Sequence, residues 1–283
     1  MKAYINQFTN YLQERNLSYN TIKVYNDNLE EFDEFIGRRK SIRRIGRKEI
    51  KAFLSFLSEK GNQPITRRAK LIAIRSFFKY LEDENLIKRN TTKNFPLPKV
   101  TIKEPTYLLE GEIKKILRLT KKDKNKRAEI AIRIFSETGI RLSELVNVSV
   151  GDIDVRSKAM RIKRKGDIEQ TIPLNNNLNK LLRCFIKNRN SGMPLIVNKR
   201  GGRMTARRVA IMVKDYFKKA KVEKAGISVH SIRHSFCSRL LEKGVDLKTI
   251  QILAGHKNIS TTERYLHVPD MKIRKEVMLA EIC

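Results

Sequence analysis

The stretch VHSIRHSFCSRLLEKGVDLKTIQILAGHKNISTTERY, residues 229–265, contains three of the four histidines in a chain of 283 residues. They are His230, His234 and His256, and the fourth, His267, follows just beyond the stretch. Arginines and lysines surround them, and the stretch ends on Tyr265. Rare imidazoles gathered beside cations and a phenol indicate a chemical site.

Apolar spacing before this stretch predicts an N-terminal helical bundle. Apolar residues recur at intervals of three and four from Ile22 to Ile36, which is typical of an amphipathic helix. Ser18 or Asn20 caps its start and Gly37 ends it. Further helices are predicted over 2–15, over 47–59 and from Pro64 to Leu81. Four helices in fewer than 90 residues indicate a small all-helical bundle with its aromatic residues in the core.

The rest of the chain predicts a second, mainly helical domain. Alternating stretches at 153–155, 160–162 and 170–174, separated by turn residues, predict a three-stranded antiparallel meander. Helices are predicted at about 110–120, 126–138, from 143 onward, 176–189, 205–221, 229–243, 246–254, 260–266 and 270–281. The expected fold class is mostly α, with one small sheet.

A proline-rich segment separates the two parts. Residues 91–106 hold three of the seven prolines and lack helical periodicity, which predicts a linker. The expected domains are therefore 1–90 and 107–283, joined by a linker at 91–106.

Net charge indicates a polyanionic partner. The chain has 61 Lys and Arg against 30 Asp and Glu, a formal charge of +31. The part up to Pro98 carries 20 − 11 = +9 and the remainder carries 41 − 19 = +22. Because both parts are basic, we expect both to grip a nucleic-acid duplex, in the manner of a clamp. A merely lysine-rich background composition is the alternative, but acidic residues would then be raised as well.

Composition also excludes several classes of protein. The N-terminus does not resemble a signal peptide, and no apolar run is long enough to span a bilayer. The three cysteines (Cys184, Cys237 and Cys283) are odd in number and form no CxxC pair, which favours a reducing cytosol. We expect a soluble, cytoplasmic protein without a membrane partner.

Metal and nucleotide cofactors have no support in the sequence. His230 and His234 have the spacing of a zinc pair, but the residues between them are Ser, Ile and Arg, and no Glu follows the first histidine. Neither a GxxxxGK[ST] loop nor a GxGxxG fingerprint is present. The sequence therefore predicts neither a metal nor a cofactor.

The cations and the tyrosine suit phosphodiester chemistry when they are taken together. Two guanidinium forks, from Arg141 and Arg233, match the oxygens of one phosphate. The phenol of Tyr265 has an ordinary pKa of about 10 and becomes a nucleophile only near cations. The departing alkoxide needs a proton, which Lys165 at a hairpin tip would deliver. Each residue alone would be an ordinary surface cation in a basic protein.

Four ordered motifs resemble the signature boxes of the tyrosine recombinase (phage integrase) family. They are TGIRLSEL, HSIRHSF, LAGHKNISTTERY and the KG of the hairpin. The N-terminal segments SYNTIKVYNDNLEEFDEF and KLIAIRSFFKYLEDENLIKRN are similar to that family's core-binding domain. The resemblance implies that domain 1–90 binds DNA and that domain 107–283 carries the catalytic site. The resemblance covers nearly the whole chain. In its compact length the chain most resembles the Xer-type members of the family, including those of archaea.

The resemblance implies a role for each motif residue. Arg141 and Arg233 would hold the scissile phosphate, and His230 and His256 would contact its oxygens or manage the phenol proton. Lys165 would be the general acid and Tyr265 the nucleophile that forms a 3′-phosphotyrosyl bond. Glu144 would orient Arg141. His234 and Cys237 would support the site without taking part in the reaction, and His267 has no assigned role. Lys165 is preferred over its neighbours Lys163 and Arg164 because a glycine follows it.

Two small departures from the motifs are Ile232 and Ala254, where Leu is usual. Both keep the position apolar, although Ala254 leaves room that another group must fill.

The implied function is site-specific DNA recombination through a Holliday junction, by a tetramer on two DNA sites. The helix at 270–281 would dock on a neighbouring subunit. Chromosome dimer resolution and integration or excision of a mobile element both stay open. The alternatives are a type IB topoisomerase, which shares the chemistry, and a DNA-binding regulator without catalysis.

Overall fold

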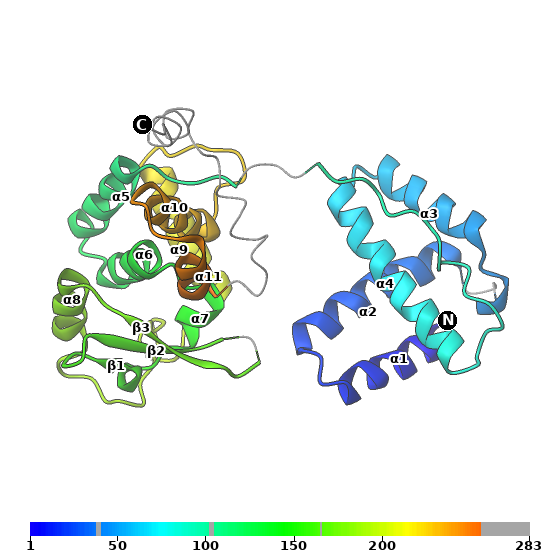
Figure 1. Ribbon diagram of the computed structural model, residues 1–283, viewed down its shortest axis with the longest axis horizontal. Coiled ribbons are helices and arrows are strands. Elements are labelled where there is room, and N and C mark those ends of the chain that lie inside the picture. The colour runs from blue at the N-terminus through cyan, green and yellow to red at the C-terminus, as the bar shows by residue number, and fades with distance from the viewer. Residues whose placement is uncertain (38–40, 102–104, 165, 256–283) are drawn as a thin grey trace, which may run out of the picture. The chain divides into compact units, whose positions relative to one another are not determined.

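The computed structural model describes residues 1–37, 41–101, 105–164 and 166–255. The chain divides into two compact units, Met1–Lys103 and Glu104–Cys283 (Figure 1). Each unit has a hydrophobic core of its own. Within the described residues, no helix is both long enough and apolar enough to cross a membrane.

The first unit is a bundle of four α-helices. They are α1 (Lys2–Glu14), α2 (Tyr19–Ile36), α3 (Arg47–Glu59) and α4 (Pro64–Asp83), with a short 3₁₀ turn, η1 (Ile42–Arg44). The side chain of Ser18 caps α2 by accepting the N–H of Thr21, and α2 ends at Gly37, as the spacing predicts. Five phenylalanines, Phe8, Phe32, Phe53, Phe77 and Phe78, are fully buried. The predicted bundle and its aromatic core are confirmed.

The start of the proline-rich segment packs on this unit. Thr92 is fully buried, and Thr91 donates its hydroxyl to the carbonyl of Ile45 at 3.2 Å. Phe95 and Leu97 contact the aromatic core. The described residues between Asp83 and Glu110 form no helix, which is what their proline content predicts.

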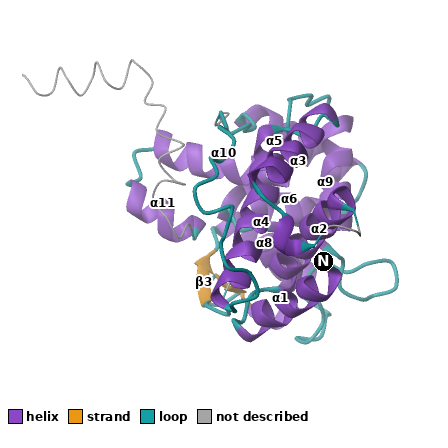
Figure 2. Cartoon of the chain, turned by 90° about the vertical axis from the view of Figure 1, so that its right-hand side faces the viewer, coloured by secondary structure: helices purple, strands orange, loops and turns teal. Residues whose placement is uncertain are grey.

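The second unit is mainly helical and carries the small sheet, drawn as orange strands in Figure 2. Its helices are α5 (Glu110–Lys122), α6 (Lys126–Thr138), α7 (Leu142–Asn147), α8 (Asn176–Ile186), α9 (Ala206–Lys219), α10 (Val229–Glu242) and α11 (Leu247–Ala254), with a 3₁₀ turn, η2 (Val150–Asp152). α6 contacts α5, α8, α9 and α10, so it lies at the centre of the unit.

The sheet is the predicted antiparallel meander. Its strands are β1 (Ile153–Asp154), β2 (Ala159–Lys163) and β3 (Glu169–Pro173), in the order β1-β2-β3. Met160 pairs with Ile153 on one side and with Ile172 on the other. Alternate residues of β2 are buried and exposed, because one face of the sheet covers the core. The fold class, mostly α with one small sheet, is confirmed.

The largest difference between a predicted and an observed helix boundary is at the end of α8. The apolar spacing predicts a helix over 176–189, but α8 ends at Ile186. Arg189 lies in a turn, where its N–H bonds the carbonyl of Ile186. Its guanidinium donates to the carbonyl of Leu195 at 2.9 Å. This side-chain contact with the following loop stabilises the turn in place of a further helical turn.

Candidate active site

A glycine turn brings α6, α7 and α10 together. Gly139 follows α6 with φ +64°, in the left-handed region that favours glycine. A Cβ at this position would overlap the ring of Phe236 on α10. The end of α6 therefore lies directly against α10, and Arg141 comes two residues later at the start of α7.

Glu144 holds Arg141 in a fixed orientation. One oxygen of the Glu144 carboxylate accepts the backbone N–H of Arg141 at 2.7 Å, and the other accepts Nη1 of its guanidinium at 2.8 Å. Glu144 is 3% exposed, so this ion pair is shielded from solvent on the carboxylate side. The expected orienting contact between these two residues is present.

Arg233 is a buried cation in the middle of α10. It is 4% exposed, and its guanidinium donates to the carbonyls of Gly139 and Ala254. One side chain thus joins the end of α6 to the end of α11. A buried guanidinium costs free energy unless it is hydrogen-bonded, and these carbonyls supply part of that bonding.

The C-terminal end of α11 is the meeting point of three arginines. Arg164 Nη2 donates to the carbonyl of Leu253 at 2.7 Å, and Arg141 Nη2 donates to that of Gly255 at 2.6 Å. Arg233 binds the carbonyl between them, that of Ala254. The last carbonyls of a helix lack intrahelical partners and carry a partial negative charge, which attracts cations. Figures 1 and 2 show α11 next to α10, with α7 beneath it in Figure 1.

His230 belongs to the same group of residues. Desolvation by the surrounding protein lowers the pKa of its imidazole, and the positive charges of Arg233 and Arg141 lower it further. The residue is nevertheless accessible to solvent. A neutral, accessible imidazole beside two guanidiniums can accept a proton or donate a hydrogen bond to an anion.

The structure therefore brings together Arg141, Glu144, His230 and Arg233, which the sequence motifs place in one site. Cys237 is fully buried in a small cluster with Phe236, Ile250 and Ala254, in agreement with a supporting role. His234 is half-buried on α10. Lys165, His256, Tyr265 and His267 lie outside the described residues, as do the helices predicted at 260–266 and 270–281.

Arg164 is the contact that sequence reasoning missed. The sequence offers it only as a neighbour and rival of Lys165 at the hairpin tip. Its position against α11 depends on how the sheet packs in three dimensions, and no motif in the sequence indicates it. A Cβ at Gly255, where φ is +62°, would coincide with the guanidinium of Arg164.

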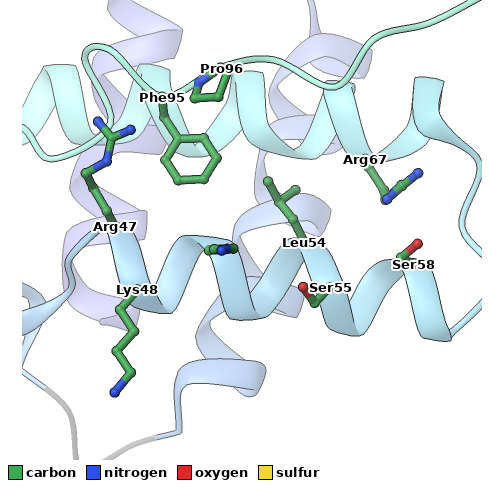
Figure 3. A pocket seen from close by; sticks show the side chains of 9 residues that line it. Arg47, Lys48, Leu54, Ser55, Ser58, Arg67, Phe95 and Pro96 are labelled. Atoms are coloured by element: carbon green, nitrogen blue, oxygen red, sulfur yellow. The ribbon is translucent and has the colours of Figure 1, made fainter.

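The first unit has a basic groove of about 670 Å³ between α3, α4 and the segment that follows α4. It is lined by Arg47, Lys48, Lys51, Leu54, Ser55, Ser58, Arg67, Phe95 and Pro96. Figure 3 shows Arg47 beside Phe95, and the guanidinium carbon is 5.3 Å from the ring centre. Cations mixed with serines and an aromatic ring suit the phosphates and sugars of a nucleic acid.

Two family models match the chain. The phage integrase family model matches residues 106–272, and the model of the phage integrase N-terminal SAM-like domain matches residues 5–85. Among curated relatives, tyrosine recombinase XerC of Herpetosiphon aurantiacus is 34% identical over 284 residues, which covers 95% of this chain and 91% of the relative. XerC of Bacillus subtilis is 30% identical over 295 residues, with 98% and 96% covered.

Solved structures share the fold. A complex of the Tn1549 transposon integrase with transposon right end DNA superposes with a TM-score of 0.81 at 22% identity, covering 98% of this chain and 99% of that one. The crystal structure of XerA recombinase gives a TM-score of 0.54 at 24% identity, covering 100% and 99%.

Proposed function

Because the chain belongs to the phage integrase family of tyrosine recombinases, we propose that it is a site-specific recombinase that cuts and rejoins double-stranded DNA. The observation that carries this proposal is the pair of guanidiniums, from Arg141 and Arg233, that meet at the end of α11. Glu144 supplies one negative charge against them. The resulting positive excess suits a phosphodiester, and more so its transition state, which carries additional negative charge.

The proposed reaction is a transesterification. The phenolic oxygen of Tyr265 attacks the phosphorus, an O–P bond to the tyrosine forms, and the bond to the 5′ oxygen breaks. Lys165 protonates that 5′ oxygen as it leaves. Arg141 and Arg233 bind the non-bridging oxygens, and His230 and His256 bind them or manage the phenol proton. One phosphoester replaces another, so that the reverse attack by a 5′ hydroxyl rejoins DNA without ATP.

Both units would grip the DNA. The first unit offers the basic groove of Arg47, Lys48, Lys51 and Arg67, and the second carries the catalytic residues. Relatives at 30–34% identity are named XerC, and structural neighbours include a lambda integrase dimer bound to a COC′ core site. On this basis we propose Xer-like recombination through a Holliday junction, by a tetramer on two sites in the cytoplasm. The segment 270–281 would dock on a neighbouring subunit.

The DNA substrate can be identified directly. Genomic fragments that stay covalently attached to the protein after denaturation are sequenced, and two copies of the recovered site are placed on one plasmid. The proposal predicts inversion or deletion between the two copies. Relaxation of supercoils without exchange between the copies would instead support a type IB topoisomerase, and specific binding without covalent attachment would support a regulator.

A further inference from the structure

We infer that Arg164 is a positioning residue that fastens the β2–β3 hairpin to the C-terminal turn of α11. This inference rests on the proposed function, because its consequence concerns the general acid at the tip of that hairpin. It assigns to Arg164 a role separate from the phosphate contacts of Arg141 and Arg233.

The first observation is the path of the Arg164 side chain. It leaves the end of β2, and its Nη2 atom donates to the carbonyl of Leu253 at 2.7 Å, across 89 residues of sequence. Gln170 of β3 adds a longer contact from its amide to the carbonyl of Ile252, at 3.4 Å. The residue that follows β2 and a residue of β3 thus bond neighbouring carbonyls of α11.

The second observation is the backbone of Arg164. Its N–H donates to the carbonyl of Ile168 at 2.8 Å, which joins the residue after β2 to the residue before β3. The same residue therefore bonds to the start of β3 through its backbone and to α11 through its side chain. Since Lys165 is the next residue in the chain, any shift of Arg164 relative to α11 is passed to it directly.

The third observation is that this guanidinium is poorly placed for stability alone. Its Nε and Nη1 atoms are buried, and no described residue accepts a hydrogen bond from them. Each buried donor without an acceptor costs about 1–3 kcal/mol. Burial and the charge of Arg141 lower the pKa of Arg164, while Glu144 opposes this effect. These costs offset part of the stabilisation that the bond to Leu253 contributes.

The consequence is specific to one chemical step. If Arg164 places the hairpin tip, its loss should impair protonation of the departing 5′ oxygen and leave nucleophilic attack intact. A substrate whose 5′ bridging oxygen is replaced by sulfur makes this distinction. A thiol is far more acidic than an alcohol (the pKa of a cysteine thiol is about 8.5), so the sulfur leaves as a thiolate without a proton. In that substrate the bond from Tyr265 to phosphorus forms, the P–S bond breaks, and the sulfur carries the electron pair away.

The experiment measures the rate at which the full-length protein forms a covalent adduct with the recovered DNA site. The protein is present at a concentration that saturates the DNA, and the site is made in two forms, with oxygen or with sulfur as the 5′ bridging atom. We expect Arg164→Ala to react about 10- to 100-fold more slowly than the wild type on the oxygen substrate. This is less than the roughly 100- to 10,000-fold that a general acid contributes, because the acid is misplaced and not removed. On the sulfur substrate it should react at nearly the wild-type rate. Arg156→Ala, which removes an exposed arginine from the turn between β1 and β2, is the matched control and should react normally on both.

Three outcomes would overturn the inference. Arg164→Ala could react normally on both substrates, or it could be equally slow on both, which would assign Arg164 to the phosphate. Loss of the folded state in both Arg164→Ala and Arg164→Gln, seen by thermal unfolding, would assign it a structural role. Failure of the proposed function looks different, because the wild-type protein itself would then form no adduct on either substrate.

Discussion

The guanidinium of Arg141 donates to the carbonyl of Gly255 at 2.6 Å, although 114 residues separate the two in the sequence. The other terminal nitrogen of that guanidinium, Nη1, donates to the carboxylate of Glu144. The proposed phosphate clamp and the backbone that leads to His256 are therefore parts of one hydrogen-bonded unit. Changes at either end of this unit should affect both stability and cleavage.

Glu144→Gln should weaken this unit measurably. The amide keeps the size of the carboxylate but loses its charge and one of its two acceptor oxygens, so Arg141 loses part of its support. We expect a loss of about 1–3 kcal/mol in the free energy of unfolding, measured by urea denaturation, together with slower cleavage. Glu110→Gln is the matched control, because it breaks only the exposed Glu110–Lys114 pair and should change little. Equal effects of the two substitutions would contradict this account.

Gly255→Ala should cost more than an ordinary substitution of a left-handed glycine. Gly244, with φ +81° and no neighbour within 4 Å of a Cβ, provides the control for backbone strain alone, which costs about 1–2 kcal/mol. At Gly255 the added methyl group also meets Arg164. We expect the free energy of unfolding to fall further in Gly255→Ala than in Gly244→Ala.

The extra loss of unfolding free energy in Gly255→Ala, compared with Gly244→Ala, comes from the contact with Arg164. It should largely disappear when Gly255→Ala is made in an Arg164→Ala background, because the two residues are coupled. Additive effects of the two substitutions would show that they do not meet.

The pKa of His230 reports on the cations around it. In the folded protein it lies below the ordinary value of 6.5, because of desolvation and then the charges of Arg233 and Arg141. Arg141→Ala should raise it towards 6.5, as followed by an NMR titration in which His230→Gln identifies the signal. Since the folded-state pKa is lowered, the unfolded chain takes up this proton first, and His230 should cost stability as the pH falls below 6.5. A pKa that stays the same or falls in Arg141→Ala would contradict the arrangement.

The basic groove of the first unit should contribute to DNA affinity. Arg47→Ala/Lys51→Ala should weaken binding and reduce the slope of log K against log salt by up to about 2, because up to two phosphate contacts are lost. Lys2→Ala/Arg15→Ala removes the same charge from the two ends of α1, Lys2 in its first turn and Arg15 just after it, and should have a smaller effect. Fluorescence anisotropy at several salt concentrations provides the measurement. Equal slopes for the two double variants would remove the groove from the DNA interface.

Local rules were sufficient to predict most of the fold. Ser18 and Gly37 mark the limits of α2 because capping and left-handed termination act within a few residues. The sheet followed from alternation, since one face of β2 lies on the core. The end of α8 was missed because Arg189 turns towards Leu195 through a contact that apolar spacing does not contain.

The candidate site was only partly predictable. Arg141, Glu144 and Arg233 stood out because they lie in short motifs. Arg164 did not, because its role depends on the packing of a hairpin against the end of α11, and neither element signals the other in the sequence. The positive φ of Gly255 already favours glycine, and the packing of Arg164 adds a second reason for the absent side chain.

The central claim is that Tyr265 attacks DNA. Its most direct test is incubation of the protein with a duplex that carries a nick near the cleavage point, so that the released fragment diffuses away and the covalent intermediate accumulates. We predict a protein–DNA adduct that survives denaturation, maps to the peptide containing Tyr265 and is absent in Tyr265→Phe. No adduct with the wild-type protein, or an adduct that persists in Tyr265→Phe, would contradict the account.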